Sequence, residues 1–172
     1  MISFKAYQAL ARRFDQIPLY DERSADQETP VSLYARRKSG KGSFLLESVV
    51  GGDQIGRYSF VGLDPVKLVS DLANLPHSSP SLHADDPYFA ALPPFHGGAV
   101  GFLSYEWARR IETLPKPKPS TLKWPEMAFM QCQQLLALDH AKQRLLLMAQ
   151  TQPKKDGLRA AYRAGQTALK QL

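Results

Sequence analysis

Apolar and polar positions follow the helix period near both ends of the chain and the strand period through its middle. Behind Ser3, apolar residues return every three or four positions up to Phe14, which predicts a first helix capped by that serine. Thr29-Pro30 predicts the start of a second helix, because threonine is a good cap and proline loses no hydrogen bond at the first helical position. A last helix is predicted with Asp156 as its cap.

Runs rich in β-branched, aromatic and alternating residues fill most of the remaining sequence. The last two runs flank a short polar turn and therefore predict an antiparallel hairpin. A segment with four prolines, at 72–93, predicts an irregular surface loop, and 107–114 predicts a short helix. The predicted strands lie at 17–20, 43–50, 57–63, 66–71, 97–105, 127–138 and 144–150.

This mixture predicts an α+β fold, with mostly antiparallel sheet and flanking helices, in a single domain covering residues 1–172. The longest apolar stretch falls well short of the ~20 residues of a transmembrane helix, so we expect no membrane partner. The chain has one cysteine, Cys132, in a strand-like run. A buried thiol in the reducing cytoplasm is therefore the predicted setting.

The net charge of +6 raises nucleic acid as a partner. The basic residues are scattered, however, and no cluster is interleaved with the aromatic side chains that stack on bases. We therefore expect a solvated basic surface and no nucleic acid. A positive field also attracts small anionic substrates, an alternative that composition leaves open.

No complete active site is visible in the sequence. The four histidines lie in predicted loops and turns, without a second histidine or a cysteine at metal-ligand spacing. No serine stands in a nucleophile motif, and the glycines of 97–105 lack the spacing of a phosphate-binding loop. We therefore predict no catalytic residue and no metal site.

The run from Phe44 to Gly62 places an acid and a hydroxyl, Glu47 and Ser48, directly behind an apolar strand. Because side chains alternate between the two faces of a strand, one of this pair points toward the core side or into a pocket at the strand end. A carboxylate there needs a cationic partner. The alternative is an ordinary strand that ends in polar residues at a turn.

Three blocks in this sequence resemble the N-terminal half of anthranilate synthase component I, in the order and spacing of that family. They are Phe44-Leu-Leu-Glu-Ser48 with Gly56-Arg-Tyr-Ser-Phe60, then 94–106, then Trp124-Pro-Glu-Met-Ala-Phe-Met130 leading to Leu138-Asp-His140. The similarity extends over nearly all of the chain. Phe102 and Glu106 depart from the family pattern, which usually has tyrosine and aspartate there.

The resemblance implies a regulatory and structural domain of an enzyme that converts chorismate to anthranilate in tryptophan biosynthesis. In that family the apolar strand contributes to the pocket where tryptophan binds and inhibits. Carried over, Glu47 receives the ligand's ammonium, Ser48 supplies a hydroxyl and Pro30 forms an apolar wall. Arg57 either lines the pocket or pairs with Glu47 when the pocket is empty.

Chorismate and magnesium bind in the C-terminal half of the family's enzymes, so the resemblance implies that this chain by itself has no cofactor and is inactive. The implied partners are tryptophan, that C-terminal half and the glutamine amidotransferase subunit, component II. The alternatives are the same half of aminodeoxychorismate synthase component I and a stand-alone binding or scaffold domain. We also expect self-association through an exposed apolar sheet face that includes Met127, Phe129, Leu135 and Leu147.

Overall fold

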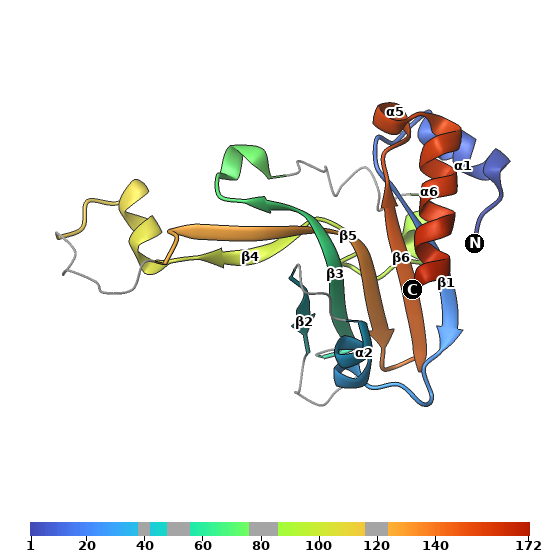
Figure 1. The fold of residues 1–172 in the computed structure, drawn as a ribbon, viewed down its shortest axis with the longest axis horizontal. Helices are drawn as coiled ribbons and strands as arrows, with labels where there is room; N and C mark the ends of the chain where they lie inside the picture. Colours follow the sequence, from blue (N-terminus) through green and yellow to red (C-terminus); the bar gives the residue numbers. More distant parts are fainter. Residues whose placement is uncertain (38–41, 48–55, 76–85, 116–123) are drawn as a thin grey trace.

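The computed structural model describes residues 1–37, 42–47, 56–75, 86–115 and 124–172. Its centre is a six-stranded antiparallel sheet in the order β1-β6-β5-β3-β2, with β4 paired to β5 outside that path (Figure 1). The strands are β1 Ile17–Ser24, β2 Phe44–Leu46, β3 Tyr58–Val69, β4 Ala99–Leu103, β5 Met127–Asp139 and β6 Arg144–Thr151. The α+β fold with mostly antiparallel sheet is therefore confirmed.

Strand β5 is long enough to take part in two separate regions of the sheet. Along one edge it pairs with β3 over most of its length. Along the other edge it pairs first with β4, from Met127 to Gln131, and then with β6, from Gln134 to Asp139. The β6 half forms the compact body of the domain, whereas the β4 half projects from it as an arm (Figure 1).

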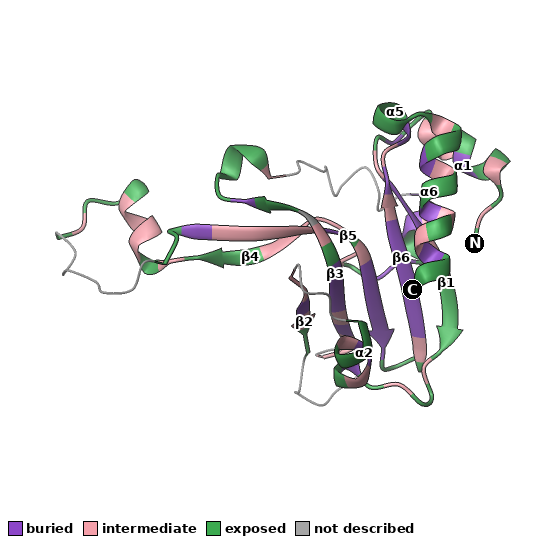
Figure 2. Cartoon of the chain, in the orientation of Figure 1, coloured by how far each residue is buried: buried purple, intermediate pink, exposed green. Residues whose placement is uncertain are grey.

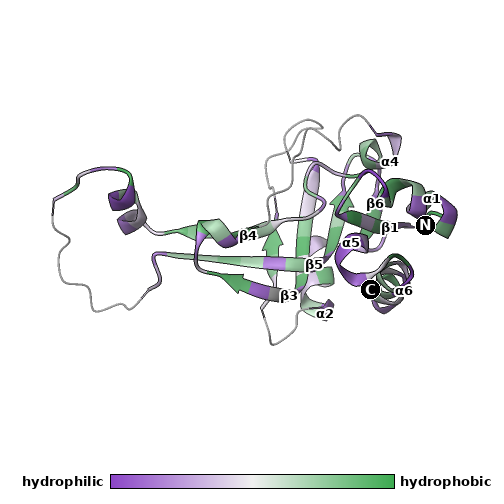
Figure 3. Cartoon of the chain, turned by 90° about the horizontal axis from the view of Figure 1, so that it is seen from above, coloured by the Kyte–Doolittle hydropathy of each residue, from purple (hydrophilic) through white to green (hydrophobic). Residues whose placement is uncertain are grey.

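Helices cover both faces of the body, as the edge-on view in Figure 3 shows. Helices α2 and α6 lie on one face and α4 on the other. The helical elements are α1 Phe4–Ala11, α2 Pro30–Arg37, α4 Pro87–Ala90, α5 Pro153–Asp156 and α6 Leu158–Gln171, with 3₁₀ turns η1 Leu72–Asn74 and η2 Tyr105–Arg110. Within the described residues, no helix is long and apolar enough to cross a membrane.

The predicted caps and hairpin are largely confirmed. The Ser3 hydroxyl accepts a hydrogen bond from Ala6 N at 3.2 Å, and α2 begins at Pro30. The β5–β6 hairpin closes at the pair Asp139 and Arg144. Cys132 is buried, as expected.

The predicted division of β3 and the predicted cap of the last helix are wrong. Residues 57–63 and 66–71 belong to the single strand β3, because a register shift between Pro65 and Lys67 bends the strand without ending it. Asp156 does not cap the last helix: it closes the short turn α5, where its own N–H donates to Gln152 O. Gly157, at φ 82°, then separates α5 from α6, a backbone angle that favours glycine.

The predicted loop at 72–93 contains structure where it is described. The Asp86 carboxylate accepts a hydrogen bond from Tyr88 N at 3.0 Å and so caps α4, which begins at Pro87. This is the same combination of cap and proline that marks α2 in the sequence. The predicted helix at 107–114 is instead the 3₁₀ turn η2.

The predicted exposed apolar face is also wrong. Met127, Leu135 and Leu147 are each at most 3% exposed, and Phe129 is half-buried. Figure 2 shows the β5–β6 hairpin as mostly buried. The largest exposed apolar side chains lie mostly on the arm, where Tyr105 is 79% and Trp124 70% exposed. Self-association therefore stays a prediction without the surface on which it was based.

Candidate functional site

Glu47, the predicted ammonium-binding residue, directly follows β2 at the edge of the sheet and is exposed. Strand β2 is held to β3 in antiparallel register, with Leu46 opposite Phe60. Ser48 lies outside the described residues. Within those residues Glu47 has no ion-pair partner.

Pro30, the predicted apolar wall, is buried as the first residue of α2. Helix α2 packs against both β2 and β3. Pro30 and Glu47 therefore belong to two elements that contact each other.

Arg57, the fourth predicted site residue, is committed to a different partner from the one considered in the sequence. Its Nε donates to Asp139 Oδ1 at 2.9 Å and its Nη2 donates to Asp139 Oδ2 at 2.8 Å. This bidentate geometry is the strong form of an arginine–carboxylate pair. Arg57 therefore does not neutralise Glu47 in this structure.

Asp139 is the centre of a buried charge network that sequence reasoning missed. Its side chain is fully buried and receives a further contact from Arg144 Nε at 3.3 Å, while Arg144 Nη1 donates to Glu22 at 2.8 Å. Hydrogen bonds from Arg57 lower the pKa of Asp139 to about 2, against the opposing effect of burial. Through these ion pairs, charged side chains link β1, the start of β3 and the β5–β6 turn.

The residue after Asp139 ties the same turn to β3 a second time. His140 N donates to Arg57 O at 2.9 Å, and His140 Nε2 lies 2.8 Å from the hydroxyl of the buried Ser59. The sequence signal for this arrangement was the Leu138-Asp-His140 block. Nothing in the spacing of that block shows which residues it contacts, because those partners lie about 80 positions earlier.

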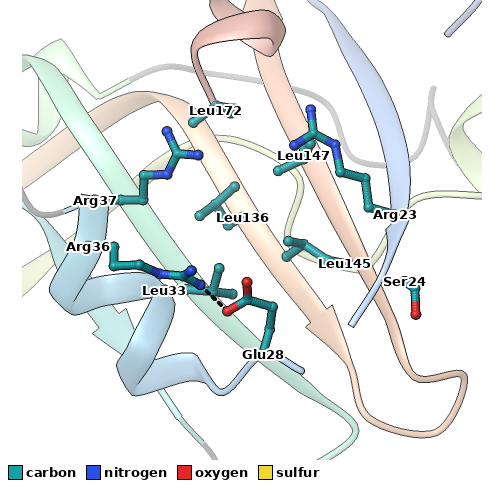
Figure 4. A pocket seen from close by; sticks show the side chains of 10 residues that line it. All are labelled: Arg23, Ser24, Glu28, Leu33, Arg36, Arg37, Leu136, Leu145, Leu147 and Leu172. Atoms are coloured by element: carbon teal, nitrogen blue, oxygen red, sulfur yellow. Dashed lines mark hydrogen bonds and ion pairs between the residues drawn. The ribbon is translucent and has the colours of Figure 1, made fainter. Parts of the chain in front are cut away.

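A cavity of about 490 Å³ opens between α2 and the end of α6, on the face of the sheet that these helices cover (Figure 4). Leucines form its floor and arginines its rim. None of the three described tryptophan-binding candidates, Pro30, Glu47 and Arg57, lines it. Its lining residues are Arg23, Ser24, Glu28, Leu33, Arg36, Arg37, Leu136, Leu145, Leu147 and Leu172.

A second, more polar hollow of about 270 Å³ lies at the other end of the sheet, where Gln131, Gln150 and Lys155 meet. Cys132 lines it, but burial raises the pKa of this thiol to about 11. Such a thiol is almost fully protonated at neutral pH and is a poor nucleophile.

Among the described residues, no three His, Cys, Asp or Glu side chains are grouped so that they can hold a metal ion. Taken together, the described residues form an α+β domain with a sheet-edge carboxylate and a basic, leucine-floored cavity.

The chain belongs to the anthranilate synthase component 1 family. It is 38% identical over 156 residues to anthranilate synthase component 1 of Streptomyces coelicolor, which covers 86% of this chain. The corresponding proteins of Acetivibrio thermocellus and Neisseria meningitidis serogroup C are 33% identical over 155 residues and 32% identical over 189 residues. These matches cover 79% and 94% of this chain.

The chain spans only about a third of the length of these relatives: 29%, 31% and 38% respectively. A crystal structure of anthranilate synthase component I from Streptococcus pneumoniae aligns over 87% of this chain and 36% of its own length, with 18% identity and a TM-score of 0.49. No family model matches the chain.

Proposed function

We propose that this chain is the N-terminal part of an anthranilate synthase component 1 and carries part of the site through which tryptophan inhibits the enzyme. The family supports the first half of the proposal. The observation that supports the second half is the commitment of Arg57 to Asp139, which leaves Glu47 without an ion-pair partner among the residues that the structure describes. An unpaired carboxylate at an apolar strand end is suited to an amino-acid ammonium.

Each proposed contact has a chemical reason. The contact between the ligand ammonium and Glu47 is charge-assisted, and such bonds are roughly twice as strong as neutral ones. Ser48 supplies a hydroxyl next to it, and Pro30 gives the indole ring a rigid apolar neighbour. In this proposal Arg57 has a structural role, because its ion pair with Asp139 prevents it from pairing with Glu47.

The remaining parts of the function lie beyond these residues. We propose that chorismate and magnesium bind in a C-terminal half, that component II delivers ammonia from glutamine, and that the enzyme works in the cytoplasm. Tryptophan binding here then changes activity only as far as tryptophan prefers one arrangement of the two halves over another. The chain by itself should make no anthranilate from chorismate.

Calorimetry with tryptophan tests the proposed site. We expect roughly millimolar affinity for the unmutated chain, because half a pocket covers only part of the indole. Glu47→Gln keeps the size of the side chain and removes its charge, and should weaken binding by a factor of roughly 10 to 150. Glu112→Gln, which removes an exposed carboxylate on the arm, is the matched control and should leave binding unchanged.

Two outcomes contradict the proposal. Equal affinity of the Glu47→Gln and unmutated chains would show that Glu47 is an ordinary strand-end acid. Failure of the folded, unmutated chain to bind tryptophan at any soluble concentration would remove the site altogether.

A further inference from the structure

The cavity between α2 and α6 has both components of a binding site for an amphiphilic anion. Its volume of about 490 Å³ lies within the usual range of small-molecule pockets, roughly 300–1,000 Å³. Its floor is apolar: Leu136, Leu145 and Leu147 are at most 6% exposed and rise from the paired strands β5 and β6. Such a floor offers an apolar ligand body a preformed surface.

The rim of the cavity carries an excess of positive charge. Among its described lining side chains there are three arginines and one carboxylate, that of Glu28. Glu28 is ion-paired with Arg36 and also interacts electrostatically with Arg37, so one described carboxylate faces three guanidinium groups. Arg37 Nη1 donates to Gln171 O at 2.6 Å, and within the described residues Arg23 has no ion-pair partner.

The guanidinium groups of Arg23 and Arg37 come from different elements and lie at opposite sides of the leucine floor. Arg23 extends from β1 and Arg37 from the last turn of α2, and Figure 4 shows Leu136 and Leu147 between them. Two like charges around an apolar hollow repel each other, and an anion placed between them relieves that repulsion. A guanidinium has five N–H donors in a planar fork that matches a carboxylate.

We propose that this cavity binds a small amphiphilic carboxylate, whose apolar body rests on the leucine floor and whose carboxylate lies between Arg23 and Arg37. The site is separate from the proposed tryptophan site, because Pro30, Glu47 and Arg57 do not line it. It also discriminates against amino acids. Their ammonium group meets a rim with excess positive charge, in which the one carboxylate among the described side chains is paired with Arg36.

The probe 1-naphthoate tests the proposal, with 1-naphthalenemethanol as a neutral analogue of similar size. In methyl-resolved NMR spectra, 1-naphthoate should shift the signals of Leu136, Leu145 and Leu147. The alcohol should bind several-fold more weakly, because it lacks the charge that the rim recognises. Shifts confined to residues outside the cavity would overturn the proposal.

Charge variants make the test specific. Arg23→Gln combined with Arg37→Gln should weaken 1-naphthoate binding roughly five- to tenfold, since exposed charge contacts are partly screened by water. It should leave binding of the alcohol unchanged. Arg12→Gln combined with Arg110→Gln removes the same net charge from exposed positions elsewhere and is the control. If both double variants weaken 1-naphthoate equally, only net charge matters and the assigned site is wrong.

Discussion

Arg57 and Asp139, 82 positions apart in the sequence, form a two-bond ion pair at the end of the sheet. Asp139 is fully buried and Arg57 is 33% exposed, so the pair spans the boundary between core and solvent. The same carboxylate contacts Arg144 and accepts a bond from Lys142 N at 3.3 Å. The charge of Asp139 is therefore surrounded by donors from the start of β3 and from the β5–β6 turn.

Asp139→Asn should destabilise the fold strongly. The amide keeps the shape of the side chain, but it leaves Arg57 and Arg144 facing each other without an anion. Breaking a buried ion pair typically costs about 3 kcal/mol or more, which urea unfolding would measure. Glu126→Gln is the control: it removes the partner of Arg110 in a pair whose two side chains are 52% and 61% exposed, and should cost about 0.5 kcal/mol or less. Equal, small losses in both variants would count against the network.

Asp139 should also make stability depend on pH in the acid range. Hydrogen bonds from Arg57 lower its pKa to about 2, below the ordinary value of 3.8. Because the folded-state pKa is the lower one, the stabilisation is fully present above about pH 4 and is lost as pH falls toward 2. The shift corresponds to about 2 kcal/mol. Urea midpoints measured across this range should fall, and Arg57→Gln should make the fall shallower than in the unmutated chain.

Cys132 should resist thiol reagents until the chain unfolds. It is 7% exposed, and burial raises the pKa of its thiol to about 11. The reactive thiolate is therefore scarce at pH 8. Labelling with a disulfide reagent should be slow in buffer and fast in urea. Rapid reaction of the native chain would contradict the burial of this strand position.

Gly165→Ala should destabilise the chain although alanine is the better helix former. A Cβ at this position would lie 2.7 Å from both Leu19 Cδ1 and Thr151 Cγ2. Thr151 cannot turn away easily, because its hydroxyl donates to Ile17 O and is bonded to Tyr7. We expect a net loss of about 1–3 kcal/mol in chemical unfolding. Thr167→Ala, at an exposed position of the same helix, should instead be neutral or slightly stabilising.

Gly101→Ala should loosen the arm and spare the body. A Cβ there would lie 2.0 Å from the backbone oxygen of Ala128, which belongs to the paired strand β5. Backbone cannot yield as a flexible side chain does, so β4 should separate from β5. Amide hydrogen exchange should speed up in β4 and stay slow in β6. Phe102→Ala, at the exposed neighbouring position, is the control and should change the exchange rate of neither strand. Equal acceleration of exchange in β4 and β6 of the Gly101→Ala variant would contradict a local effect.

The elements that the sequence predicts well depend on nearby residues. Ser3 and Pro30 mark helix starts through chemistry within one turn, and the β5–β6 hairpin joins segments adjacent in sequence. Asp86 carried the same kind of signal for α4 and was missed because the surrounding prolines indicated a loop. The bend in β3 was missed for a different reason. Strand β5 pairs across it, and that support comes from outside the segment.

The features of the candidate site also differ in whether a local sequence pattern could predict them. Glu47, Ser48, Pro30 and Arg57 come from motif resemblance, and their role in tryptophan binding stays a prediction. The pair between Arg57 and Asp139 and the rim of the α2–α6 cavity are long-range arrangements that no local pattern contains. Arg36 and Arg37 lie in the last turn of α2, where the helix dipole favours cations, so their local sequence points to no binding role. Only the fold shows that Arg23 of β1 lies across the same leucine floor.

The pairing of β1 with β6 sets an order of events during synthesis. Ile17 lies opposite Thr151, so β1 has its partner strand far later in the chain. Until β6 has been synthesised, the fully buried Ile17 and Leu19 have no native strand to pair with. Pairing over such a distance is intrinsically slow and leaves apolar surface exposed meanwhile. Truncation before β6 should therefore leave β1 with its apolar side chains uncovered.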